Sequence, residues 1–223
     1  MTRGKLKSNQ GLITSTEERL KKDLILVNNP VLIEGLALTP IIGAALNLRN
    51  AVILSVMVPI LLVPTRFIGN ILVGIVPQKL RIMVYSIIAT ILYIPGVIAV
   101  TRLFGIRATT LGIYLPMLVV DSIITSRTEV PNRESVFSSL FGGILSCIGF
   151  ALAAVLVGAT REILGFGHIW GKTIIEKAPL PIFSTVAGGL IIACLCCAAF
   201  QYLVSAIKRA KYRYAKDSWY KKS

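Results

Sequence analysis

Apolar and polar residues follow one another along the chain in long blocks. Between about residue 31 and residue 207, six apolar runs are separated by short polar or proline-marked segments. A helix needs about 20 apolar residues to cross the hydrocarbon core of a bilayer, and most of these runs come near that length. The pattern predicts an all-α integral membrane domain over residues 30–207, with spans at 31–48, 51–76, 82–101, 111–125, 136–159 and 183–207.

The first and fourth runs are irregular. A proline interrupts the first at Leu38-Thr39-Pro40, and the fourth, around Pro116, covers only residues 111–125. A straight helix of that length would reach about 22 Å, short of a core of about 30 Å. Short, proline-broken segments that open two three-span halves are typical of an inverted 3+3 repeat with half-helices meeting inside the membrane. Two ordinary kinked helices are the alternative, since membrane helices tolerate proline.

Composition agrees with a membrane location. The chain has 223 residues, of which 55% are hydrophobic, and its mean hydropathy of +0.76 is too high for a soluble domain. All four cysteines lie within apolar runs and lack the paired spacing of a zinc site, so no metal site and no disulfide framework are expected. The segment before residue 31 is polar, so no cleavable signal peptide is expected either.

The net charge of +14 is concentrated at the two ends of the chain. Residues 1–29 hold six Lys and Arg, and residues 208–223 hold seven. With both termini in the cytoplasm, 17 cations lie on the cytoplasmic face and 6 on the opposite face. The positive-inside rule therefore predicts a multi-pass protein of the cell membrane with cytoplasmic N- and C-termini. The basic tails favour anionic lipid over nucleic acid as a partner.

The N-terminal tail of residues 1–29 contains a predicted short helix. Ser15 and Glu18 have capping-box spacing, and apolar residues recur at helical intervals over residues 15–27. Lysines and arginines on its other side predict that this amphipathic helix lies on the membrane surface. Asn29 follows as the predicted N-cap of the first span.

Three ionisable side chains fall inside predicted spans: Glu34, Arg66 and Asp121. Placing such a charge at the centre of a membrane helix costs about 3 kcal/mol on insertion scales, so each needs a partner, a wet cavity or a function. Glu34 lies near a helix start, where the helix dipole favours an anion. Asp121 lies deepest. Two interpretations stay open for it: pairing with Arg66 or a neighbour, and handling of a cation or proton.

The predicted fifth span ends near Arg161 and Glu162, with Gly165 shortly after. An adjacent Arg and Glu at the end of a span is most simply an interfacial anchor. The chain has one histidine and no nucleophile and base at useful spacing, so no catalytic residues are predicted.

Four sequence stretches stand in a specific order and spacing from residue 28 onward. They are Asn28-Asn29-Pro30-Val31-Leu32, the break at Leu38-Thr39-Pro40, Leu111-Gly112-Ile113-Tyr114-Leu115-Pro116 continuing to Arg127-Thr128-Glu129, and Arg161-Glu162-Ile163-Leu164-Gly165-Phe166-Gly167. Together they resemble the paired membrane subunits of the Rnf electron-transport complex and of the sodium-translocating NADH:quinone reductase. The cytoplasmic termini point to the E-type Rnf subunit, or the D-type subunit of the quinone reductase.

The resemblance implies an inverted-repeat six-helix fold that pairs with the oppositely oriented A-type paralogue, beside larger flavin-bearing membrane subunits. FMN and iron–sulfur clusters are expected in those partners. In the family, each half-helix presents a cysteine, and four cysteines from two paralogues hold a two-iron, two-sulfur cluster inside the membrane. The matching positions here are Thr39 and Ser122. A hydroxyl does not replace a thiolate as a normal cluster ligand. This chain is therefore expected to bind no cofactor, unless the match is shifted or Cys147 is recruited.

Two functions are compatible with these sequence features. The first is a non-catalytic membrane subunit of an Rnf-like electron-transfer complex, at most part of a redox-driven translocase, with Thr39, Asp121 and Ser122 at a mid-membrane break. The alternative is a membrane transporter or substrate-binding component for a small molecule such as a flavin, because the fold carries no catalytic constellation.

Overall fold

The computed structural model describes residue 29 and residues 31–129, 136–173 and 179–220. The predicted surface helix of residues 15–27 lies outside this part of the chain. The α-helices are α2 (Leu38–Ala44), α3 (Leu48–Leu72), α4 (Arg81–Phe104), α5 (Tyr114–Met117), α6 (Ser122–Thr128), α7 (Val136–Phe166) and α8 (Val186–Tyr220). Shorter elements are the 3-10 helices η1 (Gln78–Leu80), η2 (Gly105–Leu111), η3 (Leu118–Val120) and η4 (Pro181–Ser184), and the antiparallel strands β1 (His168–Ile169) and β2 (Lys172–Thr173).

Four helical stretches of the described chain are long and apolar enough to cross a membrane: Leu48–Leu72, Gln78–Phe104, Ser139–Phe166 and Val186–Ile207. They correspond to the second, third, fifth and sixth predicted spans, so the prediction of an all-α membrane protein is confirmed. Two helices continue past the predicted spans. Helix α7 continues to Phe166, beyond 159, and α8 continues to Tyr220, whereas its apolar stretch ends at Ile207.

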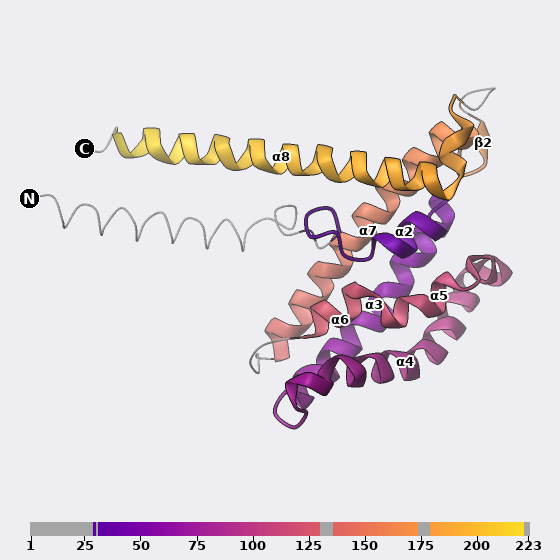
Figure 1. Ribbon diagram of the computed structural model, residues 1–223, viewed down its shortest axis with the longest axis vertical. Coiled ribbons are helices and arrows are strands. Elements are labelled where there is room, and N and C mark those ends of the chain that lie inside the picture. The colour runs from indigo at the N-terminus through magenta and orange to yellow at the C-terminus, as the bar shows by residue number, and fades with distance from the viewer. Residues whose placement is uncertain (1–28, 30, 130–135, 174–178, 221–223) are drawn as a thin grey trace, which may run out of the picture.

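Helices α3 and α7 cross at the centre of the molecule as an antiparallel pair (Figure 1). Glu162, near the end of α7, accepts a hydrogen bond from the backbone N–H of Leu48, the first residue of α3, at 2.8 Å. A Cβ at Gly158 of α7 would lie only 2.8 Å from the Cβ of Ala51, so glycine permits close packing of the two helices. Of their apolar windows, 44% is buried, against 17% for α4 and α8.

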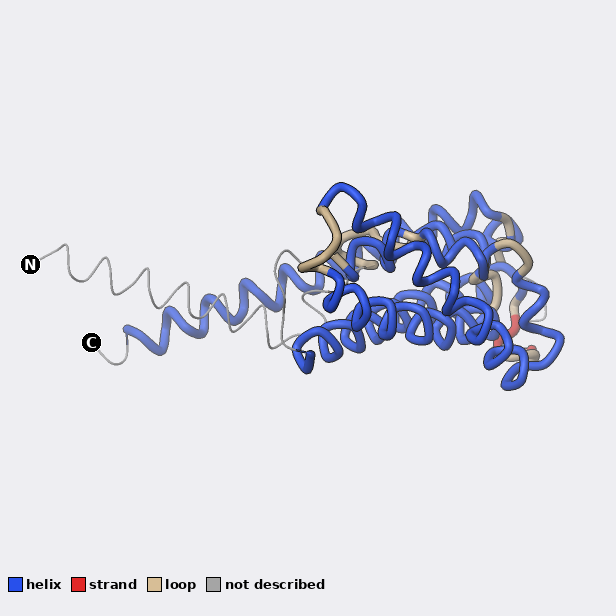
Figure 2. The backbone as a smooth tube through the Cα atoms, turned by 90° about the horizontal axis from the view of Figure 1, so that it is seen from below, coloured by secondary structure: helices blue, strands red, loops and turns tan. Residues whose placement is uncertain are grey.

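Helices α4 and α8 are therefore peripheral. The α4 side chains of Ile87, Ile91, Ile94 and Ile98 are each more than half exposed, as are Leu195 and others on α8. Exposed apolar rows of this kind suit contact with lipid or another membrane subunit. Beyond the other helices, the C-terminal part of α8 extends away from the rest of the molecule (Figure 2).

The first predicted span is broken. The side chain of Asn29 accepts hydrogen bonds from the backbone N–H groups of Val31 and Leu32, as an N-cap does, but only one turn follows. Gly35 (φ +74°) and Ala37 (φ +57°) then interrupt the chain before α2 begins. The break thus precedes Pro40, which lies in the first turn of α2, where the missing N–H of proline costs nothing.

The fourth predicted span is broken as well. It runs through η2, α5 and η3 to Asp121, whose backbone is extended (φ −66°, ψ 150°), and restarts as α6. Neither segment is a continuous kinked helix, so the alternative of two ordinary proline kinks is wrong for the described chain.

Candidate functional site

The breaks in the first and fourth predicted spans lie next to each other in the structure. The backbone N–H of Ala37, the residue before α2, donates a hydrogen bond to the hydroxyl of Ser122, the first residue of α6, at 3.0 Å. We call this meeting point, formed by Ala37, Thr39, Asp121 and Ser122, the junction. It brings together residues more than 80 positions apart in sequence and places the starts of two seven-residue helices against each other.

The two short helices extend from the junction toward opposite ends of the molecule. At one end, Arg161 of α7 donates to the carbonyl oxygen of Ile42 in α2 at 2.6 Å. At the other end, Arg66 of α3 donates to the carbonyl oxygen of Arg127 in α6 at 2.9 Å. The last carbonyl groups of a helix lack intrahelical partners and carry the negative end of its dipole, so a guanidinium stabilises them.

The spacing of these arginines fits a membrane. The start of α3 lies beside the end of α7, so Arg66 and Arg161 are separated by most of the length of α3. Arg66 follows Leu48 by 18 positions, a helical rise of about 27 Å, close to the thickness of a hydrocarbon core. The junction lies between the two arginines.

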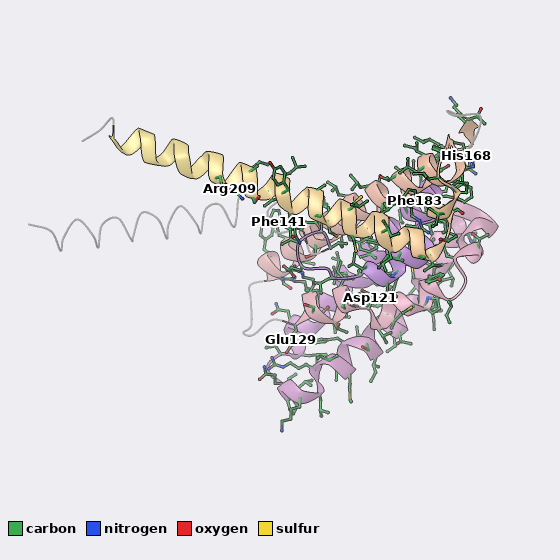
Figure 3. All side chains as sticks on the ribbon, turned by 45° about the horizontal axis from the view of Figure 1, so that its top comes forward. Asp121, Glu129, Phe141, His168, Phe183 and Arg209 are labelled. Carbon is green, nitrogen blue, oxygen red and sulfur yellow. The ribbon has the colours of Figure 1, made fainter. Side chains whose placement is uncertain are left out.

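Asp121 is buried at the junction, with 8% of its surface exposed. Its carboxylate accepts a hydrogen bond from the backbone N–H of Ile123 at 3.1 Å and one from the Ser122 hydroxyl at 3.3 Å, so it is the N-cap of α6. Arg66 binds at the far end of α6 instead, so the contacts of Asp121 in the described structure are with its neighbours Ser122 and Ile123. Asp121 lies between the ends of the molecule marked by Glu129 and His168 (Figure 3).

Arg127 pairs with a different predicted residue. Its guanidinium Nη2 lies 2.5 Å from a carboxylate oxygen of Glu34, in the turn that precedes the first break. The Glu34–Arg127 ion pair and the Arg66–Arg127 hydrogen bond therefore connect three parts of the chain at the end of α6.

Thr39 and Ser122 are both exposed, unlike their neighbour Asp121. The Ser122 oxygen already accepts from Ala37 and donates to Asp121. Among the described residues, no group of three or more His, Cys, Asp or Glu is placed to hold a metal ion. Cys147 is buried on α7. The donor set at the junction is two hydroxyls and one capping carboxylate, which does not fit an iron–sulfur cluster.

A cavity of about 360 Å³, open to the surface of the chain, lies along α6 and reaches the junction at Ser122. We call it the α6 cavity, and it is lined by Gln78, Ile82, Ser122, Thr125, Ser126 and Glu129. Five of these six side chains are polar, and Glu129 supplies the one carboxylate in the lining. The α6 cavity thus connects Glu129, which belongs to one of the four sequence stretches of the resemblance, with Ser122 at the junction.

At the opposite end, Arg161 and Glu162 are buried within the protein rather than exposed on its surface. Besides Ile42, Arg161 reaches further carbonyl oxygens, those of Ala45, Phe183 and Thr185. Glu162 accepts from the backbone N–H groups of Leu48 and Trp170 and lies 3.0 Å from the Nδ1 of His168. The pair joins α2, α3 and the segment before α8, and it lies inside α7 because that helix runs to Phe166.

Other motif residues serve packing. A Cβ at Gly165 would lie 2.9 Å from the backbone N of Ser184, so only glycine admits η4 this close. Pro40 is buried in α2, whereas Pro116 is exposed. The contact of Gly43 with the Tyr114 ring joins the two broken segments, and it was not predicted from the sequence.

The polar face of α6 was not predicted either. Its polar positions 122, 125, 126 and 129 recur at helical spacing, a signal that was present in the sequence.

Comparison with known proteins identifies the family to which this chain belongs. Residues 19–207 match the family described as "Rnf-Nqr subunit, membrane protein". Three relatives are each named as the E subunit of an ion-translocating oxidoreductase complex. They come from Shewanella oneidensis (35% identity), Shewanella sp. strain ANA-3 (34%) and Shewanella baltica strain OS185 (32%). Each match covers 145 residues, which is 64% of this chain and 62% of the relative. The chain therefore belongs to the Rnf-Nqr family of membrane subunits.

Proposed function

We propose that this chain is the E-type membrane subunit of an Rnf-like ion-translocating electron-transfer complex. The observation that carries the proposal is the junction: two half-length helices begin against each other, between the ends of a bundle that belongs to the Rnf-Nqr family. The names of the matched relatives support the E-type assignment.

The same geometry supports a six-span inverted repeat. In this proposal, the first half comprises the first broken segment, α3 and α4, and the second half comprises the other broken segment, α7 and α8. Each long central helix supplies one arginine to the end of the other half's short helix, Arg66 to α6 and Arg161 to α2. An exchange of this kind is expected when two halves of opposite orientation interlock. Both termini then lie in the cytoplasm, in accordance with the distribution of Lys and Arg.

The proposed partners are inferred from the exposed, polar side chains at the junction. Thr39 and Ser122 are open on the surface of this single chain, at a depth where a polar side chain that faces lipid is unfavourable. A second membrane subunit covering this surface removes that cost. The partner in the proposal is the oppositely oriented A-type paralogue, with flavin-bearing membrane subunits and their FMN beyond it. At the junction this chain contributes hydroxyl groups, and these do not serve as the thiolate ligands that an iron–sulfur cluster needs.

Affinity purification from native membranes tests the proposal. The tagged chain in mild detergent is expected to bring down a membrane paralogue and flavin-bearing subunits, identified by mass spectrometry and by a visible flavin spectrum. Recovery of an ATPase pair or a solute-binding protein in their place would contradict the proposal and favour small-molecule transport.

Two exposed positions offer a matched pair of variants. Thr39→Trp places a bulky ring at the junction surface and is expected to displace the paralogue. Ile75→Trp makes a similar change at a side chain that is 76% exposed, beyond the end of α3, and is expected to leave the complex intact. Loss of partners from both variants, or from neither, would count against the junction as the pairing surface.

A further inference from the structure

Helix α8 is longer than both its apolar stretch and the part of it that matches the family. The apolar stretch ends at Ile207, where the match to the Rnf-Nqr family also ends, whereas the helix continues to Tyr220. We infer that residues 208–220, which we call the α8 arm, project beyond the lipid headgroups and bind an acidic surface of a soluble cytoplasmic protein. The cytoplasmic side rests on the proposed function, but the arm and its ligand can be tested without partner subunits or electron transfer.

The α8 arm continues directly from the membrane stretch. No glycine or proline follows Gly189 in the sequence, and sharp helix kinks arise mainly at such residues. Accordingly, α8 runs on as one helix past the other helices (Figure 2). Its apolar stretch, Val186–Ile207, has 22 residues and rises by about 33 Å. This length spans a core of about 30 Å at a tilt of about 25°, so the α8 arm leaves the membrane steeply.

This geometry carries the end of the α8 arm past the lipid headgroups. Trp219 lies 12 positions after Ile207, a helical rise of about 18 Å, which is about 16 Å above the core at that tilt. The headgroup layer adds only about 5–8 Å on each side. Trp219 and Tyr220 therefore lie beyond the depth of interfacial aromatic residues, and anionic lipid accounts only for the base of the α8 arm.

The composition of the α8 arm favours an acidic protein as its ligand. Five of its 13 residues are Lys or Arg, and one is Asp. The helical period places seven positions within an arc of about 140°, and each of them is Lys, Arg, Tyr or Trp. These positions are 208, 209, 212, 213, 216, 219 and 220. Arg209, on this arc, is exposed. Arg, Tyr and Trp are enriched where proteins bind one another, and the cations select a partner of opposite charge.

Tryptophan fluorescence tests whether the α8 arm projects beyond the lipid. The full chain with Trp170→Phe is reconstituted in vesicles of phosphatidylcholine and phosphatidylglycerol that carry a nitroxide quencher on carbon 5 of an acyl chain. Trp219 is then the only tryptophan, and its fluorescence is expected to stay unquenched. The control adds Trp219→Phe and Tyr202→Trp, which places the ring at an exposed position of the apolar stretch, and it should lose most of its fluorescence. Quenching of Trp219 as strong as in the control would place the α8 arm on the anionic membrane and overturn the inference.

An acidic polypeptide tests the class of ligand. Fluorescent poly-L-glutamate is titrated against the full chain in nanodiscs of phosphatidylcholine, so that no anionic lipid competes. The arm variant removes four cations of the arc: Lys208→Gln, Arg209→Gln, Arg213→Gln and Lys216→Gln. The control variant removes four cations that the proposed topology places on the opposite face: Arg102→Gln, Arg107→Gln, Lys172→Gln and Lys177→Gln.

The two variants have the same net charge, so a difference between them reports the α8 arm itself. The arm variant is expected to bind poly-L-glutamate about tenfold more weakly than the wild type, because four exposed ion pairs are lost together. The control variant should bind like the wild type. Equal weakening in both variants, or in neither, would overturn the α8 arm as a docking surface. Neither assay contains the proposed partner subunits, so both can be interpreted even if the proposed function fails.

Discussion

A fully buried guanidinium shows how single residues stabilise this membrane fold. Arg161 has no exposed surface. Its guanidinium donates to carbonyl oxygens of α2, of Ala45 directly after α2, and of the segment before α8. These carbonyl groups lie at element ends, where helical hydrogen bonds are missing. The planar, five-donor fork of arginine suits this arrangement, and the single ammonium of lysine does not.

Replacing Arg161 with lysine is therefore expected to destabilise the protein although the charge is retained. Several buried carbonyls would lose their donors, at about 1–3 kcal/mol for each group left unsatisfied. A thermal shift measured by size-exclusion chromatography of the detergent-solubilised complex should show a clear loss. Arg209→Lys, at an exposed position on α8, is the control. Equal melting temperatures for both variants would refute the role assigned to Arg161.

Asp121 combines two roles that substitution can separate. As an N-cap it needs only an acceptor oxygen, which asparagine retains. Asp121→Asn is expected to keep the wild-type melting temperature, whereas Asp121→Ala loses about 1 kcal/mol. If the carboxylate charge serves cation passage, redox-driven cation uptake by vesicles should nevertheless fall in the Asn variant. Unchanged uptake with Asp121→Asn would confine this residue to capping.

At the scale of elements, glycines decide how closely α3 and α7 pack. A methyl group at Gly158 would lie 2.8 Å from the Cβ of Ala51, whereas one at Gly74 would meet nothing within 4 Å. Gly158→Ala is expected to cost about 1–3 kcal/mol through overpacking, and Gly74→Ala should be neutral or slightly stabilising. Thermal unfolding of the two purified variants provides the comparison. A stable Gly158→Ala variant would mean that the central helix pair is looser than described.

The elements were only partly predictable from the sequence. The four long spans and the two broken ones follow from apolar run lengths, because bilayer thickness sets those lengths. The exact break before α2 was misplaced at Pro40, since proline is visible in a sequence and the left-handed conformation of Ala37 is not. The end of α7 was placed too early because Arg161 and Glu162 are polar residues, although tertiary hydrogen bonds bury both.

The candidate site shows the same limit. Asp121 was identified because an ionisable group within an apolar run needs an explanation, whereas Thr39 and Ser122 were identified through the resemblance to the Rnf and quinone reductase subunits. The pairing of Glu34 with Arg127 joins segments 93 positions apart, and no local pattern indicates it. Helical spacing along α6 could have indicated the α6 cavity, but its other wall comes from Gln78 and Ile82, which only the folded chain brings near.

At the scale of the whole molecule, the proposed topology has a direct test. Alkaline phosphatase fused after Leu80 or after Ser223 should be inactive, because both points are cytoplasmic in the proposal. Fused after Gly105, at the end of α4, it should be active. Green fluorescent protein at the same three points should give the reciprocal pattern. An active phosphatase after Ser223 would reverse the orientation and with it the assignment as an E-type subunit.

In the proposed assembly, this subunit meets its partner through hydroxyls rather than through cluster thiolates. The decisive measurement is iron and acid-labile sulfide per purified complex, compared between the wild type and the combined Thr39→Ala and Ser122→Ala variant. Equal iron and sulfide content is expected in the two complexes at equal subunit composition. Iron and sulfide that disappear with the two hydroxyls, while the partners remain bound, would show instead that this chain ligates a cluster at the junction.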